Sequence, residues 1–169
     1  VVASILSSTS GSAANPAFAP EFGKSLPPVG FVKFCVLNPT ECKNVGRRVK
    51  RVDASPQIWK TLLKLNTQIN TAIAPISDDE LYGVPEFWTY PTSAGDCEDY
   101  LLLKKRELEK LGFDSGSLLI TVVLDEKNEG HAVLMVATKS GDYVLDNRRN
   151  DILLWSDTGY TFLKRQSQQ

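Results

Sequence analysis

The amino-acid sequence predicts a single α+β domain in which helices pack on an antiparallel β-sheet. Three observations support this: a chain of 169 residues, two segments with apolar residues at helical spacing, and a later change to β-branched runs separated by polar turns. A chain of this length buries a core without metals or cross-links. Hydrophobic residues make up 42% and charged residues 23%, so general disorder is not expected.

Two helices are predicted. Ser55 and Pro56 are a typical N-cap and first helical residue, and the helix that they begin ends before Pro75. Its apolar residues at helical spacing are Ile58, Trp59, Leu62, Leu65, Ile69 and Ile73. The second helix runs from about Cys97 to Leu111, with Asp96 available as N-cap and Gly112 as the C-terminal stop. The side chains expected on its solvated side are Lys104, Lys105, Glu109 and Lys110.

The sequence after Gly112 changes to strand character. Residues 118–124 and 131–138 form two predicted strands, and 143–146 begin a third. Residues 125–130 and 139–142 are polar and predict the connections between them. Two helices followed by an antiparallel meander define the α+β class.

The N-terminal residues Val1 to Pro20 carry no charge and are rich in Ser, Ala and Gly. Ala17-Phe18-Ala19 could end a secretory signal, although the basic segment that opens such a signal is missing. The alternative is a flexible arm. We therefore predict an arm or signal remnant over residues 1–24 and a single domain over residues 25–169.

Composition narrows the possible functions. There are 19 basic and 20 acidic residues, for a net charge of -1, which gives no reason to expect a nucleic-acid partner. The apolar runs fall far below the ~20 residues of a membrane span. No phosphate-binding Gly loop or dinucleotide fingerprint is present.

Cys97 is a candidate nucleophile because it lies where a helix begins, and the positive end of a helix favours a thiolate. A small buried hydrophobe is the alternative for an isolated Cys. A nucleophilic Cys needs a base, and the base needs a group that holds its tautomer. His131, the sole His, opens a predicted strand, and Asp146 lies on the next strand.

The register of these two strands decides whether His131 and Asp146 meet. If opposed residue numbers sum to an odd value, the two side chains share a face of the sheet; if even, they do not, unless a bulge intervenes. A tight turn centred on residues 138–139 would place them side by side. A turn centred on residues 140–141 would leave them about four residues, or ~13 Å, apart. The sequence leaves both turns open.

The acids around Cys97 oppose its ionisation. Asp96, Glu98 and Asp99 place up to three negative charges beside the thiol and would raise its pKa. A hard cation such as calcium would cancel these charges, since clustered carboxylates are its natural ligands. The alternative is that Asp96 caps the helix while Glu98 and Asp99 favour its first turn through the helix dipole.

Cys35 and Cys42 are seven residues apart, with Pro39 suited to a turn between them. A disulfide would imply an oxidising compartment and leave Cys97 as the free thiol. Two reduced, buried thiols in a cytosolic protein are the alternative.

Four segments resemble the bacterial transglutaminase-like cysteine peptidases, over about residues 31–154. They are Tyr82-Gly83-Val84-Pro85-Glu86-Phe87-Trp88, Gly95-Asp96-Cys97-Glu98-Asp99-Tyr100, Gly130-His131-Ala132-Val133-Leu134 and Val144-Leu145-Asp146-Asn147. The resemblance implies the papain-like, transglutaminase-like fold. It also implies Cys97 as nucleophile, His131 as general base and acid, and Asp146 as the orienting carboxylate.

The resemblance further implies calcium beside the nucleophile, bound by Asp96, Glu98 and Asp99. Characterised members are periplasmic and cleave large surface adhesins, proteins that act in biofilm formation. Some are restrained by the periplasmic domain of an inner-membrane cyclic-di-GMP receptor. We therefore expect an exported, calcium-dependent cysteine endopeptidase with a Cys-His-Asp triad, an adhesin-like protein substrate and possible control by such a receptor.

Two other functions fit the same residues. An amine acceptor would make the protein a transglutaminase, and a side-chain amide substrate would make it an amidase, because the cleft rather than the nucleophile decides between them. A calcium-dependent protein-binding module with an inert Cys97 is the non-catalytic alternative.

Overall fold

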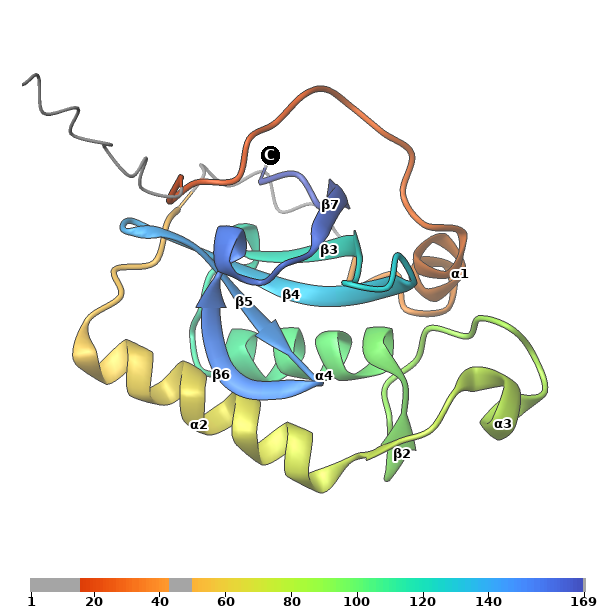
Figure 1. The fold of residues 1–169 in the computed structure, drawn as a ribbon. Helices are drawn as coiled ribbons and strands as arrows, with labels where there is room; N and C mark the ends of the chain where they lie inside the picture. Colours follow the sequence, from red (N-terminus) through yellow and green to blue (C-terminus); the bar gives the residue numbers. More distant parts are fainter. Residues whose placement is uncertain (1–15, 43–49, 169) are drawn as a thin grey trace, which may run out of the picture.

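The computed structural model describes residues 16–42 and 50–168 of the chain (Figure 1). The helices are α1 (Val29–Leu37), α2 (Pro56–Ala72), α3 (Asp78–Tyr82) and α4 (Cys97–Lys110), with 3-10 turns η1 (Ser115–Ser117) and η2 (Trp155–Asp157). The strands are β1 (Ala74–Pro75), β2 (Ala94–Gly95), β3 (Leu118–Leu124), β4 (Gly130–Thr138), β5 (Gly141–Asp146), β6 (Arg149–Leu154) and β7 (Thr161–Arg165).

The main sheet has five strands in the order β6-β5-β4-β3-β7, and every neighbouring pair is antiparallel. The predicted strands over 118–124 and 131–138 are confirmed, and the third begins two residues earlier than expected, at Gly141. Strands β6 and β7, which complete the two edges of the sheet, were not predicted, and neither were the helices α1 and α3.

The register of β4 and β5 shows where the turn between these two strands lies. Leu134 lies opposite Leu145 and Thr138 opposite Gly141, so Lys139 and Ser140 form a two-residue turn centred between the two positions considered. Opposed numbers sum to an odd value, which places His131 and Asp146 on the same face of the sheet.

Helix α4 packs on β4 on one side of the sheet, and α2 lies beside α4 and against β6 (Figure 1). The predicted N-cap of α2 is confirmed, because the Ser55 side chain accepts a hydrogen bond from the Ile58 N–H at 3.3 Å. The core between these layers contains the buried side chains Leu62, Leu101, Leu108, Ile120, Leu134 and Leu145.

The prediction that Lys104 and Lys105 are solvated is wrong, since they are only 1% and 7% exposed. Both lie on the part of α4 that the sheet covers, where the side chains of Tyr100, Leu101 and Leu108 are also buried. Lys105 is satisfied there: its ammonium donates to Glu109 at 2.8 Å, to the Ser115 hydroxyl at 2.8 Å and to the Leu118 carbonyl at 3.1 Å. Lys104 has no such set of acceptors among residues 16–42 and 50–168, and its ammonium lies over the Tyr100 ring, 5.7 Å from its centroid.

The segment before α1 crosses the opposite side of the sheet (Figure 1). Its anchor is the buried Asp142, whose carboxylate accepts from the Ala19 N–H at 2.9 Å and whose N–H donates to the Ala17 carbonyl at 2.8 Å. Arg51 and Arg165 pair with the same carboxylate at 2.7 and 3.3 Å. Residues 1–15 of the predicted arm lie outside the described residues.

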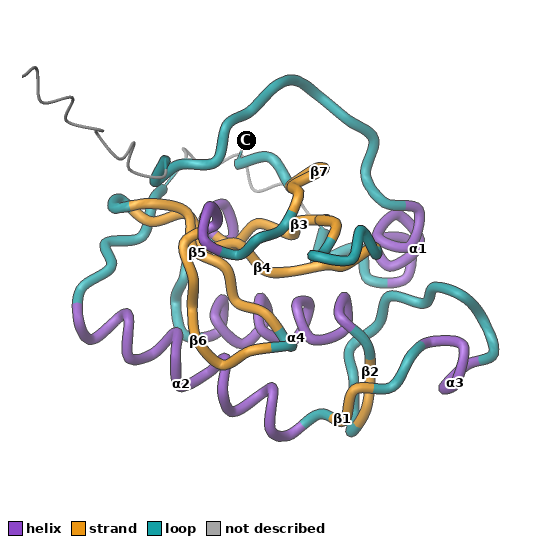
Figure 2. The backbone as a smooth tube through the Cα atoms, in the orientation of Figure 1, coloured by secondary structure: helices purple, strands orange, loops and turns teal. Residues whose placement is uncertain are grey.

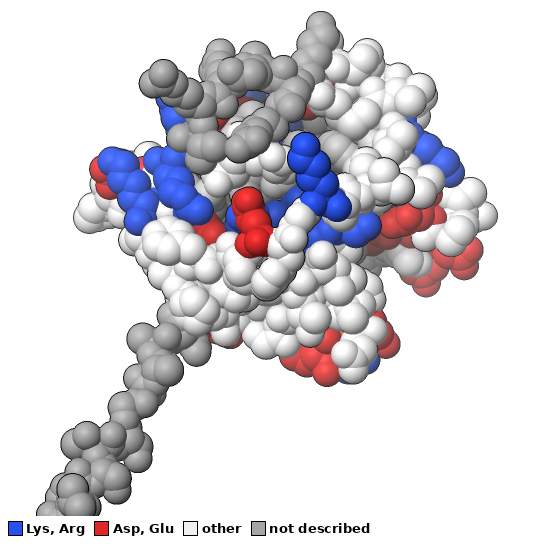
Figure 3. Space-filling model, turned by 90° about the horizontal axis from the view of Figure 1, so that it is seen from above, with Lys and Arg blue, Asp and Glu red and all other residues white. Residues whose placement is uncertain are grey.

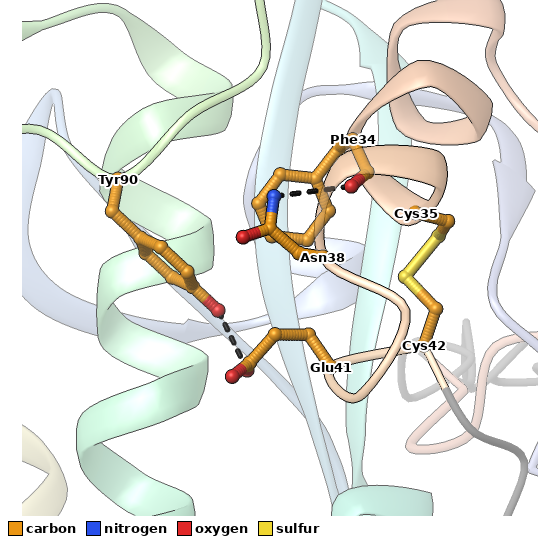
Figure 4. The surroundings of a disulfide bond; sticks show 6 residues. All are labelled: Phe34, Cys35, Asn38, Glu41, Cys42 and Tyr90. Carbon is orange, nitrogen blue, oxygen red and sulfur yellow. Dashed lines mark hydrogen bonds between the residues drawn. A yellow bond between two sulfur atoms is a disulfide. The ribbon is translucent and has the colours of Figure 1, made fainter.

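Cys35 and Cys42 form a disulfide at the end of α1, with their Cα atoms 5.5 Å apart (Figure 4). Of the two alternatives that the sequence left open, the structure therefore shows the bonded pair. Glu41 lies inside this small loop and accepts a hydrogen bond from the Tyr90 hydroxyl at 2.7 Å. The disulfide loop thereby contacts the long segment that leads from α3 to α4, drawn as a loop in Figure 2.

The surface carries charges of both signs. Seen from above, both basic and acidic side chains appear among uncharged ones, and in several places the two kinds lie side by side (Figure 3). Among the described residues, no helix combines the length and the apolar character that a membrane crossing requires.

Candidate active site

Cys97 is the first residue of α4, as predicted, and follows directly on the short strand β2. Strand β2 pairs in parallel with β1, so the segment that enters the helix is held by the end of α2 (Figure 2). Gly95 permits this entry, because a Cβ there would lie 2.6 Å from a carboxylate oxygen of Asp99. The first N–H groups of a helix lack partners within the helix and attract negative charge.

His131 and Asp146 form a buried pair, with His131 Nε2 2.9 Å from Asp146 Oδ1. Both side chains are 1% exposed. Because Nε2 faces a carboxylate, the ring is expected to carry its proton there and to leave Nδ1 as the basic nitrogen. Nδ1 is buried and has no hydrogen-bond partner among the described residues. It is therefore available to accept a proton.

Asp146 is surrounded by donors. Its Oδ1 also accepts from the Arg148 N–H at 3.0 Å, and its Oδ2 accepts from the Tyr160 hydroxyl at 2.6 Å. Burial alone would raise the pKa of Asp146, but His131, Arg148 and Tyr160 together lower that pKa to about 2. The carboxylate is thus ionised at any pH at which the protein would work.

The Cys97 thiol lies against the start of β4, where the Ala132 N–H is close enough to favour its ionisation. Its hydrogen bond in this structure goes to Glu98 Oε2 at 3.1 Å, however, and not to His131. Burial and then the adjacent Glu98 carboxylate raise the pKa of the thiol well above its ordinary value. The acidic flank opposes thiolate formation, as the sequence predicted.

Three carboxylates converge beside this thiol. Asp78, Asp96 and Glu98 each offer an oxygen within 4.8 Å of the others, which is the spacing of a metal-binding group. Burial, together with the negative charge of Asp96, raises the pKa of Asp78 and raises that of Glu98 to about 8. Without a cation, a negative charge on one of these groups opposes the ionisation of the others.

The donor chemistry fits a hard cation such as calcium. All ligand atoms are carboxylate oxygens, the type that calcium prefers. Asp78 Oδ1 and Asp96 Oδ1 are buried without a hydrogen-bond partner in the described part of the chain. The alternative role for Asp96 is not seen: its side chain does not cap α4 but accepts from the Asp78 N–H at 3.3 Å.

Asp78 was not among the residues predicted for this group. It lies 18 residues before Asp96, at the start of α3, where Ser77 caps the helix. The cap signal Ser77-Asp78-Asp79-Glu80 could have located this helix start, but not its neighbour in space. A second bond fixes Asp78, because the Phe87 N–H donates to its Oδ2.

Asp99 lies beside the group rather than in it. Its Oδ1 accepts from the Thr89 N–H at 2.9 Å, which holds the segment before β2 against α4. Burial raises the pKa of Asp99 to about 7, and the nearby Asp96 and Asp78 add to this effect. Asp99 Oδ2 has no hydrogen-bond partner among the described residues.

Comparison with known protein families matches residues 21–169 to the bacterial transglutaminase-like cysteine proteinases (BTLCP). The chain belongs to this family. Its candidate nucleophile, base and orienting carboxylate therefore lie in a domain whose family consists of cysteine proteinases. A search of curated proteins gave no match.

The solved structures similar to this chain include three of Legionella pneumophila LapG. The calcium-bound form matches with a TM-score of 0.58 and 24% identity over 68% of this chain and 67% of LapG. A second LapG structure and an EGTA-treated one each match with a TM-score of 0.55 and 25% identity, over 65% of this chain and 63% of LapG. The predicted transglutaminase-like α+β fold is confirmed.

Proposed function

We propose that this protein is a calcium-dependent cysteine endopeptidase that works by acyl transfer through Cys97, His131 and Asp146. The observation that carries the proposal is the buried His131–Asp146 pair. His131 Nδ1 has no hydrogen-bond partner among the described residues, and the Cys97 thiol lies against Ala132, the next residue along the strand. A thiol at a helix start that packs against the strand carrying a His–carboxylate pair supplies the groups that nucleophilic catalysis by Cys requires. Family membership supports the same reaction class.

The reaction would begin with a turn of the Cys97 side chain from Glu98 toward His131. Nδ1 takes the thiol proton, and Sγ attacks the carbonyl carbon of the scissile peptide. The C–N bond then breaks, the amine leaves with the proton from His131, and a thioester to Cys97 remains. Water attacks the thioester and gives its proton to Nδ1, which frees Cys97 and the new carboxyl end.

The negative oxygen that forms in each attack needs donors. The Cys97 N–H is the first of α4, and a helix start supplies both an N–H group and a favourable dipole. Asp146 stays ionised throughout and stabilises the imidazolium that forms on His131.

Asp78, Asp96 and Glu98 would hold the calcium ion. The bound cation would neutralise the carboxylates that oppose thiolate formation on Cys97. The buried, unsatisfied oxygens of this group support the assignment, and LapG is known in a calcium-bound form. Asp99, which touches the same loop, would hold the segment before Cys97 in place.

The substrate and setting follow from the family resemblance. We propose a large, repetitive surface protein such as an adhesin as substrate, the periplasm as location, and the periplasmic domain of a cyclic-di-GMP receptor as a candidate regulator. The Cys35–Cys42 disulfide supports export, because such bonds persist in oxidising compartments.

The test compares the wild-type protein with Cys97→Ala on a peptide library, with calcium or with EGTA, and identifies new chain ends by mass spectrometry. We expect new N-termini with the wild-type protein and calcium only, and an intact fold of the variant. The wild-type thiol should also react with iodoacetamide faster with calcium, a clean readout because the other two Cys are bonded to each other.

Other products would identify the alternatives. Amine incorporation at Gln side chains, measured with a labelled primary amine, would indicate a transglutaminase, and ammonia release without it would indicate an amidase. Cleavage that persists in Cys97→Ala would contradict the proposal. An unreactive thiol with and without calcium would support a binding module.

A further inference from the structure

Tyr160 touches both members of the His131–Asp146 pair. Its hydroxyl donates to Asp146 Oδ2 at 2.6 Å, and its ring meets the His131 ring edge-on, with centroids 5.7 Å apart and planes at 82°. Neither the motifs in the sequence nor the reaction described above includes this residue. It reaches the pair from the loop between η2 and β7, fourteen residues after Asp146.

The loop presents Tyr160 in a defined position. The Tyr160 N–H donates to the Thr158 hydroxyl at 3.2 Å, and that hydroxyl donates to the Trp155 carbonyl at 2.8 Å. Gly159 between them has φ +77°, a conformation that favours glycine. The Arg149 guanidinium lies over the ring, 5.6 Å from its centroid. The side chain is thus held on several sides.

The two oxygens of Asp146 have separate partners. Oδ1 faces His131 Nε2 and the Arg148 N–H, whereas Oδ2 accepts from the Tyr160 hydroxyl and has the Arg149 guanidinium farther away, with Nε at 3.9 Å. Rotation of the carboxylate about its Cβ–Cγ bond would break all three hydrogen bonds. The Tyr160 hydroxyl therefore opposes rotation of the Asp146 carboxylate. The hydrogen bonds to Oδ1 alone would oppose this rotation less strongly.

We propose that Tyr160 is a positioning residue that orients the Asp146 carboxylate, so that His131 keeps its proton on Nε2 and presents Nδ1 as the base. The inference rests on the proposed function for its catalytic meaning, but the orientation of the pair can be measured without any substrate. A purely structural Tyr160 would stabilise the loop and leave the imidazole unchanged.

The experiment uses the single His of the chain, since its ring signals in a ¹⁵N-histidine-labelled sample belong to His131 alone. Tyr160→Phe keeps the ring that packs on His131 and removes only the hydroxyl. We expect the ¹⁵N shifts of the two ring nitrogens to move toward each other as the Nε2–H tautomer loses its preference. Tyr143→Phe is the matched control, because the Tyr143 ring packs on Trp59 and its hydroxyl makes no hydrogen bond within the described residues.

Kinetics supply the second readout. In Tyr160→Phe, kcat should fall about tenfold with KM nearly unchanged, since one hydrogen bond to a charged group is lost and substrate contacts are not. Tyr143→Phe should keep both constants. Melting temperatures of the three proteins establish that the folds are equally intact.

Two results would overturn the inference: unchanged His131 ring shifts in Tyr160→Phe, or shifted rings with wild-type kcat in an active enzyme. If the wild-type protein cleaves nothing under any condition, the proposed function fails. The ring shifts still decide whether Tyr160 orients the pair, so the two failures are distinguishable.

Discussion

The two sides of the Cys97 thiol are built in opposite ways. On one side, Asp146 accepts from His131, Arg148 and Tyr160, and its pKa is lowered to about 2. On the other side, Asp78, Asp96 and Glu98 converge, and Asp78 and Asp96 each have a buried oxygen without a partner in the described part of the chain. One carboxylate is stabilised by neighbouring donors, while three others destabilise one another.

This difference indicates that the acidic side of the site, and not the His131 side, needs a bound cation. Hydrogen bonds already assemble the His131 side, so it should persist without metal. The acidic side lacks compensating positive charge within the described residues, and buried charges without partners are costly. Hence the acidic side is expected to respond to calcium and the His131 side is not.

The largest effect is expected from Asp146→Asn. The amide removes the negative charge that stabilises the imidazolium on His131, and the same substitution in a serine protease triad lowers kcat by about 10⁴-fold. We expect a loss of at least about 10³-fold in the single-turnover cleavage rate, with calcium binding retained.

The control for this variant is Asp151→Asn, an exposed Asp on β6, which should cleave at the wild-type rate. A loss of less than about tenfold in Asp146→Asn would show that the orienting carboxylate matters little to this enzyme.

The next effect concerns the acidic side. Calcium at a hundred times its dissociation constant should raise the free energy of unfolding of the wild-type protein by about 2.7 kcal/mol. Asp78→Asn should lose most of this gain, whereas the neighbouring and exposed Asp79→Asn should keep it. Without calcium, Asp78→Asn should be more stable than the wild-type protein because it removes a carboxyl group whose ionisation is opposed by burial and by the charge of Asp96. Melting curves with calcium and with EGTA measure both, and a full calcium response in Asp78→Asn would contradict the site.

The smallest effect concerns Lys104, which is buried on α4. Burial lowers the pKa of Lys104 to about 7, although Asp146 partly opposes this. The unfolded chain binds the lysine proton up to pH ~10, so it holds more protons than the folded state between pH ~7 and ~10. The wild-type free energy of unfolding should therefore rise with pH across this window.

Lys104→Met should weaken that rise and stabilise the protein at pH ~6 by about 1 kcal/mol or more, because a poorly paired buried charge is replaced by an apolar side chain. Urea unfolding at pH ~6 and ~9 measures the difference. Lys110→Met is the control on the same helix, since Lys110 is 61% exposed. An equal pH dependence of the free energy of unfolding in Lys104→Met and the wild-type protein would refute the lowered pKa of Lys104.

Much of the site could be predicted from local signals. The sequence predicts Asp96-Cys97 at a helix start, the single His on one strand and an Asp on the next. Whether His131 and Asp146 are in contact depends on the turn between their strands. The two-residue turn at Lys139 and Ser140 brings these side chains within 2.9 Å. The roles of Cys97 as nucleophile and of Asp96, Glu98 and Asp99 toward calcium stay predictions.

The sequence by itself determined α2, α4, the strands β3 to β5 and the position of the thiol at a helix start, because caps, periodicity and turn residues act over a few neighbouring positions. Only the tertiary structure decided that Asp78 joins Asp96 and Glu98, that Tyr160 binds Asp146, and that Lys104 is buried. These contacts depend on which helix face meets the sheet and on how distant segments cross. Such choices arise from packing of the whole core, and no local pattern encodes them.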